Sequence, residues 1–338
     1  MKKKGREFMI RAFELFVAIR NKSSFTSNFQ FQSDADEAGI DINTDMEKPV
    51  KIDGGWKWKT KVGTLYEEYG KMRFEPFKES VTGTKEWAKY NYNIQTGCEH
   101  DCAYCYAKAM AVRFSRVKAD GWDDVTISLK AVSKKWKKRD GTIMFPTTHD
   151  ITQANINHCL IVLDNILRAG NNVLIVSKPD PNCIRLLCDA FEMCKKQILF
   201  RFTIGSVDNQ TLKFYEPDAP SFGERLAALA HAHTRGFKTS VSIEPMLDFQ
   251  PYQIVKIVDE YVTDSIWLGL MNNARTRLKL NECSDQVIEM ADKLRLMWSY
   301  RGVKNLYEIL KDNPKIRWKD SIKKLLGLDT PQEAGLDI

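Results

Sequence analysis

Three cysteines within eight positions constrain this chain more than any other feature. Cys98, Cys102 and Cys105 stand in a C-x3-C-x2-C spacing inside the segment from Tyr92 to Tyr106. At this spacing one short loop can direct three thiolates at a single inorganic centre. A cluster of four irons ordinarily takes four protein thiolates, so three would leave one iron open to a small molecule.

A zinc site is the first alternative for these cysteines. It needs a fourth ligand, most simply from a second Cys/His pair, and His158 with Cys159 is the pair that the sequence offers. A disulfide framework is the second alternative, and the irregular spacing of the eight cysteines disfavours it. The spacing therefore favours an iron–sulfur cluster, with zinc as the next choice.

The composition is that of a soluble globular protein. The chain has 338 residues, of which 43% are hydrophobic and 28% charged, enough for one large domain with extensions or for two domains. No apolar run is long enough to span a bilayer. Reduced cysteines and the absence of a recognisable targeting signal favour the cytoplasm. The net charge of +7 permits an anionic partner without requiring one.

The segment before the cysteine loop is expected to form an extension of its own. Residues 1–20 predict an amphipathic helix, and the polar residues 21–50 predict a linker. Residues 54–62 alternate as in a strand, with Trp56 and Trp58 on one face and lysines on the other. We favour an edge strand that covers the core with its tryptophans over a basic, aromatic surface for nucleic acid.

From residue 91 onward, short apolar segments alternate with amphipathic ones, which is typical of a parallel α/β sheet. Six such units with right-handed crossovers can curl into an open barrel, a partial (βα)6 barrel. The expected division is an N-terminal extension over 1–90, the α/β core over 91–280 and a C-terminal helical extension over 281–338. Strands are predicted at 92–95, 142–145, 172–178, 198–204, 237–243 and 265–270. Helices are predicted at 107–117, 153–168, 182–195, 220–234, 251–261 and 284–300.

Polar side chains gather where the predicted strands end, and in such barrels ligands bind at those ends. His149 and Asp150 are the candidates for acid–base or substrate-orienting roles. Four of the remaining cysteines fall within predicted helices, where core packing is expected. Cys283 lies in a polar loop and is the candidate thiyl donor. The polar strand-end residues are Thr147, Thr148, His149, Asp150, Ser177, Lys178, Thr203, Ser206, Glu244, Asn272 and Asn273.

The cysteine motif, with Tyr104 just before its third cysteine, resembles the signature of the radical S-adenosylmethionine (SAM) enzymes. In that family the open iron chelates the amino and carboxylate groups of SAM, and one electron then cleaves the sulfonium to give a 5′-deoxyadenosyl radical. The protein supplies binding and orientation. The chain looks most like the spore photoproduct lyase and DNA-repair-photolyase-like branch. The matching segments are Gly97-Cys98, Ser177-Lys178, Arg201-Phe202-Thr203, Glu216-Pro217 with Arg225-Leu226, and Ile243-Glu244-Pro245.

The resemblance implies a partial barrel of the radical SAM type, with a 4Fe–4S cluster on the three cysteines and SAM beside it. Lys178 would contact the SAM carboxylate through a charge-assisted bond, and Tyr104 would pack on the adenine. Glu216 and Arg225 would either bind the cofactor or pair with each other. The implied cofactor-binding residues are Tyr104, Lys178, Thr203, Ser206, Glu216 and Arg225.

The chain departs from the lyase where that enzyme carries a hydrogen-donating cysteine, because residues 144–150 contain none. The resemblance therefore implies radical generation, but it does not by itself imply repair of thymine photoproducts. We expect a radical SAM enzyme that abstracts hydrogen from a substrate, a nucleic acid or nucleotide by resemblance and charge, with a flavodoxin- or ferredoxin-like reductant. The alternatives are a nucleic-acid-binding accessory protein with a structural cluster, and a zinc module. The basic segments 134–139 and 315–324 are either solvated faces or phosphate contacts.

Overall fold

The computed structural model describes residues 50–52, 55–59, 63–68, 71–76, 81–331 and 333–336. The chain divides into two compact units, Met1–Ser80 and Val81–Ile338, and each is described by itself. The predicted helix over residues 1–20 lies outside the described residues, as does the predicted linker apart from Val50.

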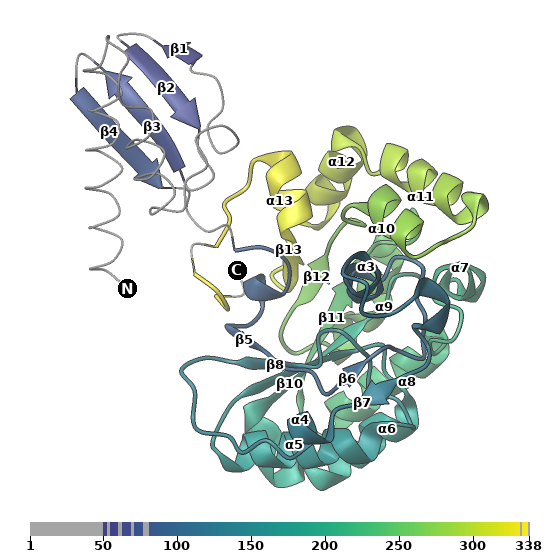
Figure 1. Ribbon diagram of the computed structural model, residues 1–338. Helices are drawn as coiled ribbons and strands as arrows, with labels where there is room; N and C mark the ends of the chain where they lie inside the picture. Colours follow the sequence, from purple (N-terminus) through teal and green to yellow (C-terminus); the bar gives the residue numbers. More distant parts are fainter. Residues whose placement is uncertain are drawn as a thin grey trace. The chain divides into compact units, whose positions relative to one another are not determined.

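The described part of the first unit is an antiparallel sheet in the order β1-β2-β3-β4 (Figure 1). The strand predicted around Trp56 is β2, and it pairs with β1 on one side and β3 on the other. The prediction of an edge strand was therefore wrong. Successive short strands fold back as antiparallel neighbours, and a neighbour on each side leaves β2 no free edge. The strands are β1 (Val50–Ile52), β2 (Gly55–Lys59), β3 (Gly63–Glu68) and β4 (Lys71–Pro76).

The second unit is built on a seven-stranded sheet in the order β5-β8-β9-β10-β11-β12-β13, and every neighbouring pair is parallel. The order in the sheet follows the order in the chain, as in part of a (βα) barrel. The predicted α/β fold is therefore confirmed. The strands are β5 (Tyr90–Asn91), β8 (Ile143–Phe145), β9 (Val173–Ser177), β10 (Ile198–Thr203), β11 (Lys238–Ile243), β12 (Ile266–Leu268) and β13 (Ile316–Trp318).

Two strand predictions need correction. The first strand lies at Tyr90–Asn91, and the nearby β6 (Gln95–Thr96) pairs with β7 (Thr126–Ile127) outside the main sheet. The segment predicted as a helical extension supplies the seventh strand, β13, which pairs with β12. Strands of two or three residues are too short for alternation to show in the sequence, so pairing within the fold decides them.

Helices surround the sheet (Figure 1), and their apolar faces pack on it. The strands supply fully buried Phe145, Ile175 and Phe200, and the helices supply Val162 and Leu229. The helices are α3 (Tyr106–Arg113), α4 (Leu129–Val132), α5 (Ile156–Arg168), α6 (Pro181–Ala190), α7 (Asn209–Tyr215), α8 (Phe222–Thr234), α9 (Pro251–Val258), α10 (Ala274–Leu280), α11 (Asp285–Met297), α12 (Tyr300–Leu310) and α13 (Asp320–Leu326). Short 3-10 turns are η1 (Gly83–Glu86), η2 (Ala119–Gly121), η3 (Glu192–Gln197) and η4 (Asp259–Tyr261).

Local signals explain where the main helices begin. Asp180 caps α6 by accepting from the backbone N–H groups of Asn182 and Cys183, at 2.8 and 2.9 Å. Ser221 and Glu224 form a reciprocal capping box at the start of α8. Among the described residues, no helix has both the length and the apolar character that crossing a bilayer requires. Because all seven strands run in parallel, their carboxyl ends open on one edge of the sheet.

Candidate active site

A cavity of about 430 Å³ lies at the carboxyl ends of the strands. The cysteine loop forms one wall, and Cys98, Cys102 and Cys105 all line it. The other walls include the ends of the strands and the segments that follow them. These contribute Thr147, Thr148, His149, Asp150, Lys178, Thr203, Glu244, Asn272 and Lys319.

Distant parts of the chain hold the cysteine loop in place. Gly97 has a φ of +92°, and a Cβ there would lie 2.7 Å from the carbonyl oxygen of Trp122, so only glycine fits. The same oxygen accepts from the N–H of Cys98 at 2.9 Å. At the other end of the loop, the Asn281 amide donates to the carbonyl oxygens of Ala103 and Cys105, at 2.8 and 3.0 Å. The loop is therefore anchored before any ligand binds.

The three thiols fit the protein ligands of an iron–sulfur cluster. They are free, Cys98 and Cys102 are buried, and Cys105 is half-buried. Burial, together with the charge of Asp150, raises the pKa of Cys98 to about 12, and burial raises the pKa of Cys102 and Cys105. Buried thiols facing one cavity ionise when a metal centre supplies positive charge. The N–H of Lys108 donates to the Cys105 sulfur at 3.4 Å, which favours its thiolate.

A second set of metal ligands overlaps this site. Ligand atoms of Cys98, His100 and Asp150 lie within 4.8 Å of one another. His100 Nδ1 and the Asp150 carboxylate are hydrogen-bonded to each other at 2.9 Å, however, so binding an ion would break that bond. The pair suggested by the sequence, His158 and Cys159, lies on α5 and does not line the cavity. The three cysteines therefore remain the better donor set.

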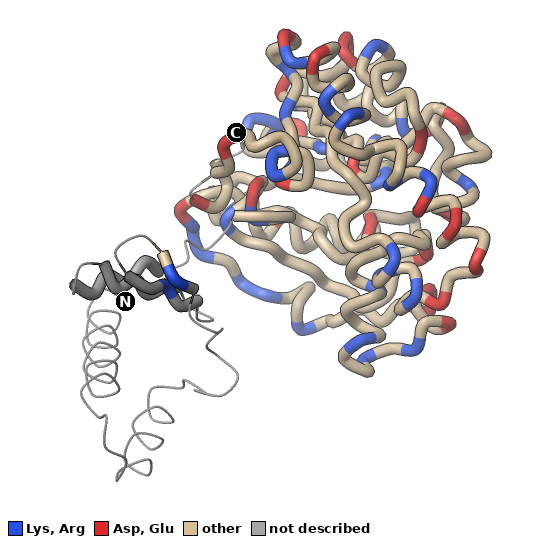
Figure 2. The backbone as a smooth tube through the Cα atoms, turned by 90° about the horizontal axis from the view of Figure 1, so that it is seen from above, with Lys and Arg blue, Asp and Glu red and all other residues tan. Residues whose placement is uncertain are grey.

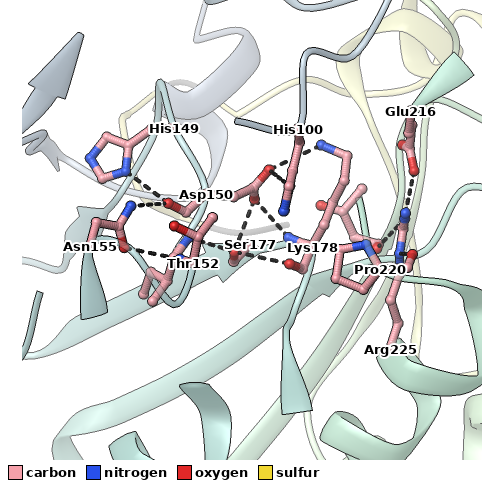
Figure 3. Close-up of polar contacts among 12 residues, drawn as sticks. His100, His149, Asp150, Thr152, Asn155, Ser177, Lys178, Glu216, Pro220 and Arg225 are labelled. Carbon is pink, nitrogen blue, oxygen red and sulfur yellow. Dashed lines mark hydrogen bonds and ion pairs between the residues drawn. The ribbon is translucent and has the colours of Figure 1, made fainter. Parts of the chain in front are cut away.

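Asp150 is the centre of a buried hydrogen-bond network (Figure 3). Its carboxylate accepts from Ser177 Oγ at 2.9 Å, from the Lys178 backbone N–H at 2.7 Å and from Lys178 Nζ at 3.4 Å. Burial acts to raise the pKa of Asp150, but Lys178 and His100 outweigh it and hold that pKa well below its usual value. Asp150 is therefore ionised, and its carboxylate links the end of β8 to the end of β9.

His149 lines the cavity, but both of its ring nitrogens are engaged. Nε2 accepts from the N–H of Ile94 at 3.4 Å, so Nδ1 carries the proton and donates to the carbonyl oxygen of Asp150 at 3.0 Å. Burial lowers the pKa of His149. The side chain is therefore a neutral imidazole in this conformation, and its predicted acid–base role stays a prediction.

Tyr104 links the cysteine loop to a buried ion pair. Its hydroxyl donates to Glu216, whose other carboxylate oxygen is paired with Arg225. The side chains of Glu216 and Arg225 are both 0% exposed, and Figure 3 shows them apart from the Asp150 network. Neither lines the cavity, whereas the Tyr104 ring does, with Lys178 Nζ 5.8 Å from its centre. The structure thus favours the pairing interpretation over a ligand role.

Replacing Glu216 with glutamine is expected to lower the free energy of unfolding by about 3–5 kcal/mol, since the Arg225 guanidinium would stay buried without a counter-charge. Urea unfolding followed by circular dichroism measures this. Asp218→Asn is the matched control, because Asp218 is exposed and its pair with Lys213 is 4.0 Å long; it should cost less than about 1 kcal/mol. A Glu216→Gln protein as stable as the control would contradict the role of this pair.

The other predicted site residues divide into two groups. Thr203 lines the cavity. Ser206 does not, and its hydroxyl donates to Asp248. Cys283 also stands outside the lining; its sulfur lies 3.5 Å from the carbonyl oxygen of Ala103, behind the cysteine loop. For Ser206 to bind the cofactor, or for Cys283 to act as a thiyl donor, its side chain would have to move into the cavity.

Tyr106 and Arg277 line the cavity but were missed from the sequence, and Lys319 was named only as part of the basic segment 315–324. Tyr106 directly follows the third cysteine, so its position was a usable signal. Arg277 lies on α10 and Lys319 follows β13, and neither element was predicted. Lys319 is buried, with Nζ 2.6 Å from Glu86 and 3.7 Å from Glu244.

Of the two basic segments, 134–139 does not line the cavity, whereas 315–324 contributes one lining residue, Lys319. In the segment 134–139, Lys138 Nζ donates to the carbonyl of Gly170 and the Arg139 N–H to Asn171, which places the segment at the amino ends of β8 and β9, away from the site. Along the segment 315–324 the described lysines are paired or buried. Figure 2 shows basic and acidic residues interspersed along the second unit.

No model of a known protein family matches the chain. An uncharacterized protein of Methanocaldococcus jannaschii is 27% identical over 176 residues, which cover 50% of this chain and 65% of that protein. An uncharacterized protein of Acidianus two-tailed virus is 24% identical over 180 residues, which cover 50% of this chain and 58% of that protein. The match thus spans less than two thirds of either relative.

Solved structures of spore photoproduct lyase are similar in the arrangement of their elements. One with bound AdoMet and dinucleoside spore photoproduct has a TM-score of 0.49 and 15% identity, and covers 72% of this chain and 79% of its own. Another, complexed with the dinucleoside, has a TM-score of 0.48 at 16% identity with the same coverage.

Proposed function

We propose that this protein is a radical SAM enzyme that binds a 4Fe–4S cluster on Cys98, Cys102 and Cys105 and abstracts hydrogen from a substrate. One observation supports this most strongly: three free thiols of one anchored loop line a single cavity at the carboxyl ends of a parallel sheet. When bound, the cluster and SAM supply a one-electron cleavage that yields a carbon radical.

The residues of the chain have separate tasks in this proposal. The cysteines hold the cluster, and Asn281 and Trp122 fix the backbone of their loop. Lys178 lies beside Tyr104 and offers a positive charge to the SAM carboxylate. The Tyr104 ring supplies an apolar surface for the adenine, while its hydroxyl stays bonded within the protein. Thr203 offers a hydroxyl at the end of β10.

We infer that the substrate is a nucleic acid or nucleotide. The net charge of +7 is compatible with an anionic ligand, and three cationic side chains, Lys178, Arg277 and Lys319, line the cavity. The electron would come from a flavodoxin- or ferredoxin-like protein. We place the enzyme in the cytoplasm, because all eight cysteines are free, as in a reducing compartment.

Anaerobic reconstitution with iron and sulfide, followed by SAM and dithionite, tests this function. We expect a cubane spectrum that changes when SAM is added, together with release of 5′-deoxyadenosine. A cluster that forms but never cleaves SAM would point to the accessory, structural role instead. No iron uptake, with one tightly held zinc, would favour a site on Cys98, His100 and Asp150, whose ligand atoms already lie close together.

A further inference from the structure

Three side-chain cations line the cavity, and they differ in their partners. Lys178 is paired with Asp150, at 3.4 Å, and Lys319 with Glu86, at 2.6 Å. Arg277 has no hydrogen-bond or ion-pair partner for its guanidinium among the described residues. The guanidinium carbon lies 5.9 Å from the centre of the Tyr106 ring. The cavity therefore contains one cation whose charge the protein does not neutralise by direct contact.

Arg277 is held where a ligand would meet it. It is half-buried on α10, the helix that follows β12, and it lines the cavity beside Cys105 and Tyr106. Burial lowers the pKa of Arg277 and outweighs the opposing effect of the Glu244 charge. Glu244 also lies in the cavity wall, and its carboxylate pairs with Lys319, at 3.7 Å. A guanidinium desolvated in this way favours an incoming anion.

We propose that Arg277 binds an anionic oxygen group of a ligand in this cavity, a carboxylate or a phosphate, on the Cys105 side of the cysteine loop. The planar guanidinium presents paired N–H donors that match both groups. This inference rests on the proposed function, which gives the group two sources: the carboxylate of SAM or a phosphate of the substrate. The other nearby cation, Lys178, lies 5.8 Å from the centre of the Tyr104 ring and is already paired with Asp150.

Binding measurements on the anaerobically reconstituted full chain test the assignment. Equilibrium dialysis gives the affinities for SAM, inorganic phosphate, thymidine 5′-monophosphate and uncharged thymidine, for the wild type, Arg277→Gln, Arg277→Lys and Arg275→Gln. Arg275 is the matched control, because it lies on the same helix, is exposed, and pairs with Asp292 at 3.3 Å outside the cavity.

We expect Arg277→Gln to lower the affinity for one anionic ligand by about tenfold to hundredfold, which is the effect of losing a hydrogen bond to a charged group. A loss for SAM alone identifies its carboxylate as the anion, and a loss for thymidine 5′-monophosphate or phosphate identifies a phosphate. Arg277→Lys should keep part of the affinity, while thymidine binding and the Arg275→Gln control should stay within about twofold of the wild type.

Unchanged affinities for SAM and for both phosphate probes in Arg277→Gln would overturn the proposal. The proposal would also be overturned if Arg277→Gln kept its SAM affinity and the wild type bound neither phosphate probe. Thermal melting of each variant shows whether it is folded; if Arg277→Gln is not, Arg277→Lys decides by the same comparison. If the wild type bound these ligands but released no 5′-deoxyadenosine, the proposed function would be contradicted. The binding measurements would still decide whether Arg277 binds the anion.

Discussion

Replacing Cys102 with alanine is expected to abolish cluster assembly, with iron and sulfide falling to the level of adventitious binding. Two thiolates cannot hold a centre that needs three. Release of 5′-deoxyadenosine should fall below about one hundredth of the wild type, because changes in the groups around metal ligands already cost about 10–100-fold. Iron and sulfide analysis after anaerobic reconstitution, with the visible spectrum, measures the first effect, and chromatography of the products measures the second.

Cys283→Ala is the control for that experiment. Cys283 packs against the same loop without lining the cavity, so its loss should leave iron and sulfide at the wild-type level. If Cys102→Ala also retained a full cluster, the three-cysteine site would be wrong. The 5′-deoxyadenosine yield and labelled-substrate exchange of Cys283→Ala would show in addition whether that thiol takes part in hydrogen transfer.

Replacing Asp150 with asparagine should destabilise the protein by about 3–5 kcal/mol, because the ammonium of Lys178 would be left without its carboxylate. The side chains of both residues are only 12% exposed, so solvent offers little compensation. The same change frees Ser177 and His100 from their shared acceptor. Urea unfolding measures the loss of stability, and SAM affinity should fall with it, since Lys178 is no longer fixed.

Two further variants separate the pair from its surroundings. Asp140→Asn removes an exposed carboxylate that pairs with Lys89 at 2.7 Å, and it should cost less than about 1 kcal/mol. In the double variant Asp150→Asn with Lys178→Met, part of the stability should return, because no buried charge is left alone. If Asp150→Asn lost no more stability than the Asp140→Asn control, Asp150 would not anchor this region.

The long elements were predictable from the sequence because they carry strong hydrophobic patterns. Helices α5 and α8 and strands β9, β10 and β11 lie close to their predicted bounds. The short elements α7, α10 and β13 were not predicted, since three to seven residues give too little periodicity to recognise. Arg277 was missed for the same reason, and Lys319 was named only as part of the basic segment 315–324, although both line the cavity.

The candidate site was predictable where chemistry and spacing coincide, and not where only side-chain direction decides. The three cysteines, Tyr104 and Lys178 line the cavity as expected. Ser206 also follows a strand end in the sequence, but its hydroxyl bonds to Asp248. Glu216, which was predicted from the resemblance, pairs with Arg225 inside the protein. A sequence names the residues at the end of a strand, whereas packing decides which of them face the opening.

The pairing of Lys319 with Glu86 joins the beginning of the second unit to its end. Lys319 Nζ also donates to the carbonyl of Gly83, at 2.8 Å, and the N–H of Gly335 donates to Lys85. During synthesis on the ribosome the cysteine loop emerges early, whereas the strand and lysine that complete the cavity wall emerge late. A nascent chain that lacks β13 therefore has the Glu86 carboxylate without its cation, so the cavity wall should be complete only after β13 has emerged from the ribosome.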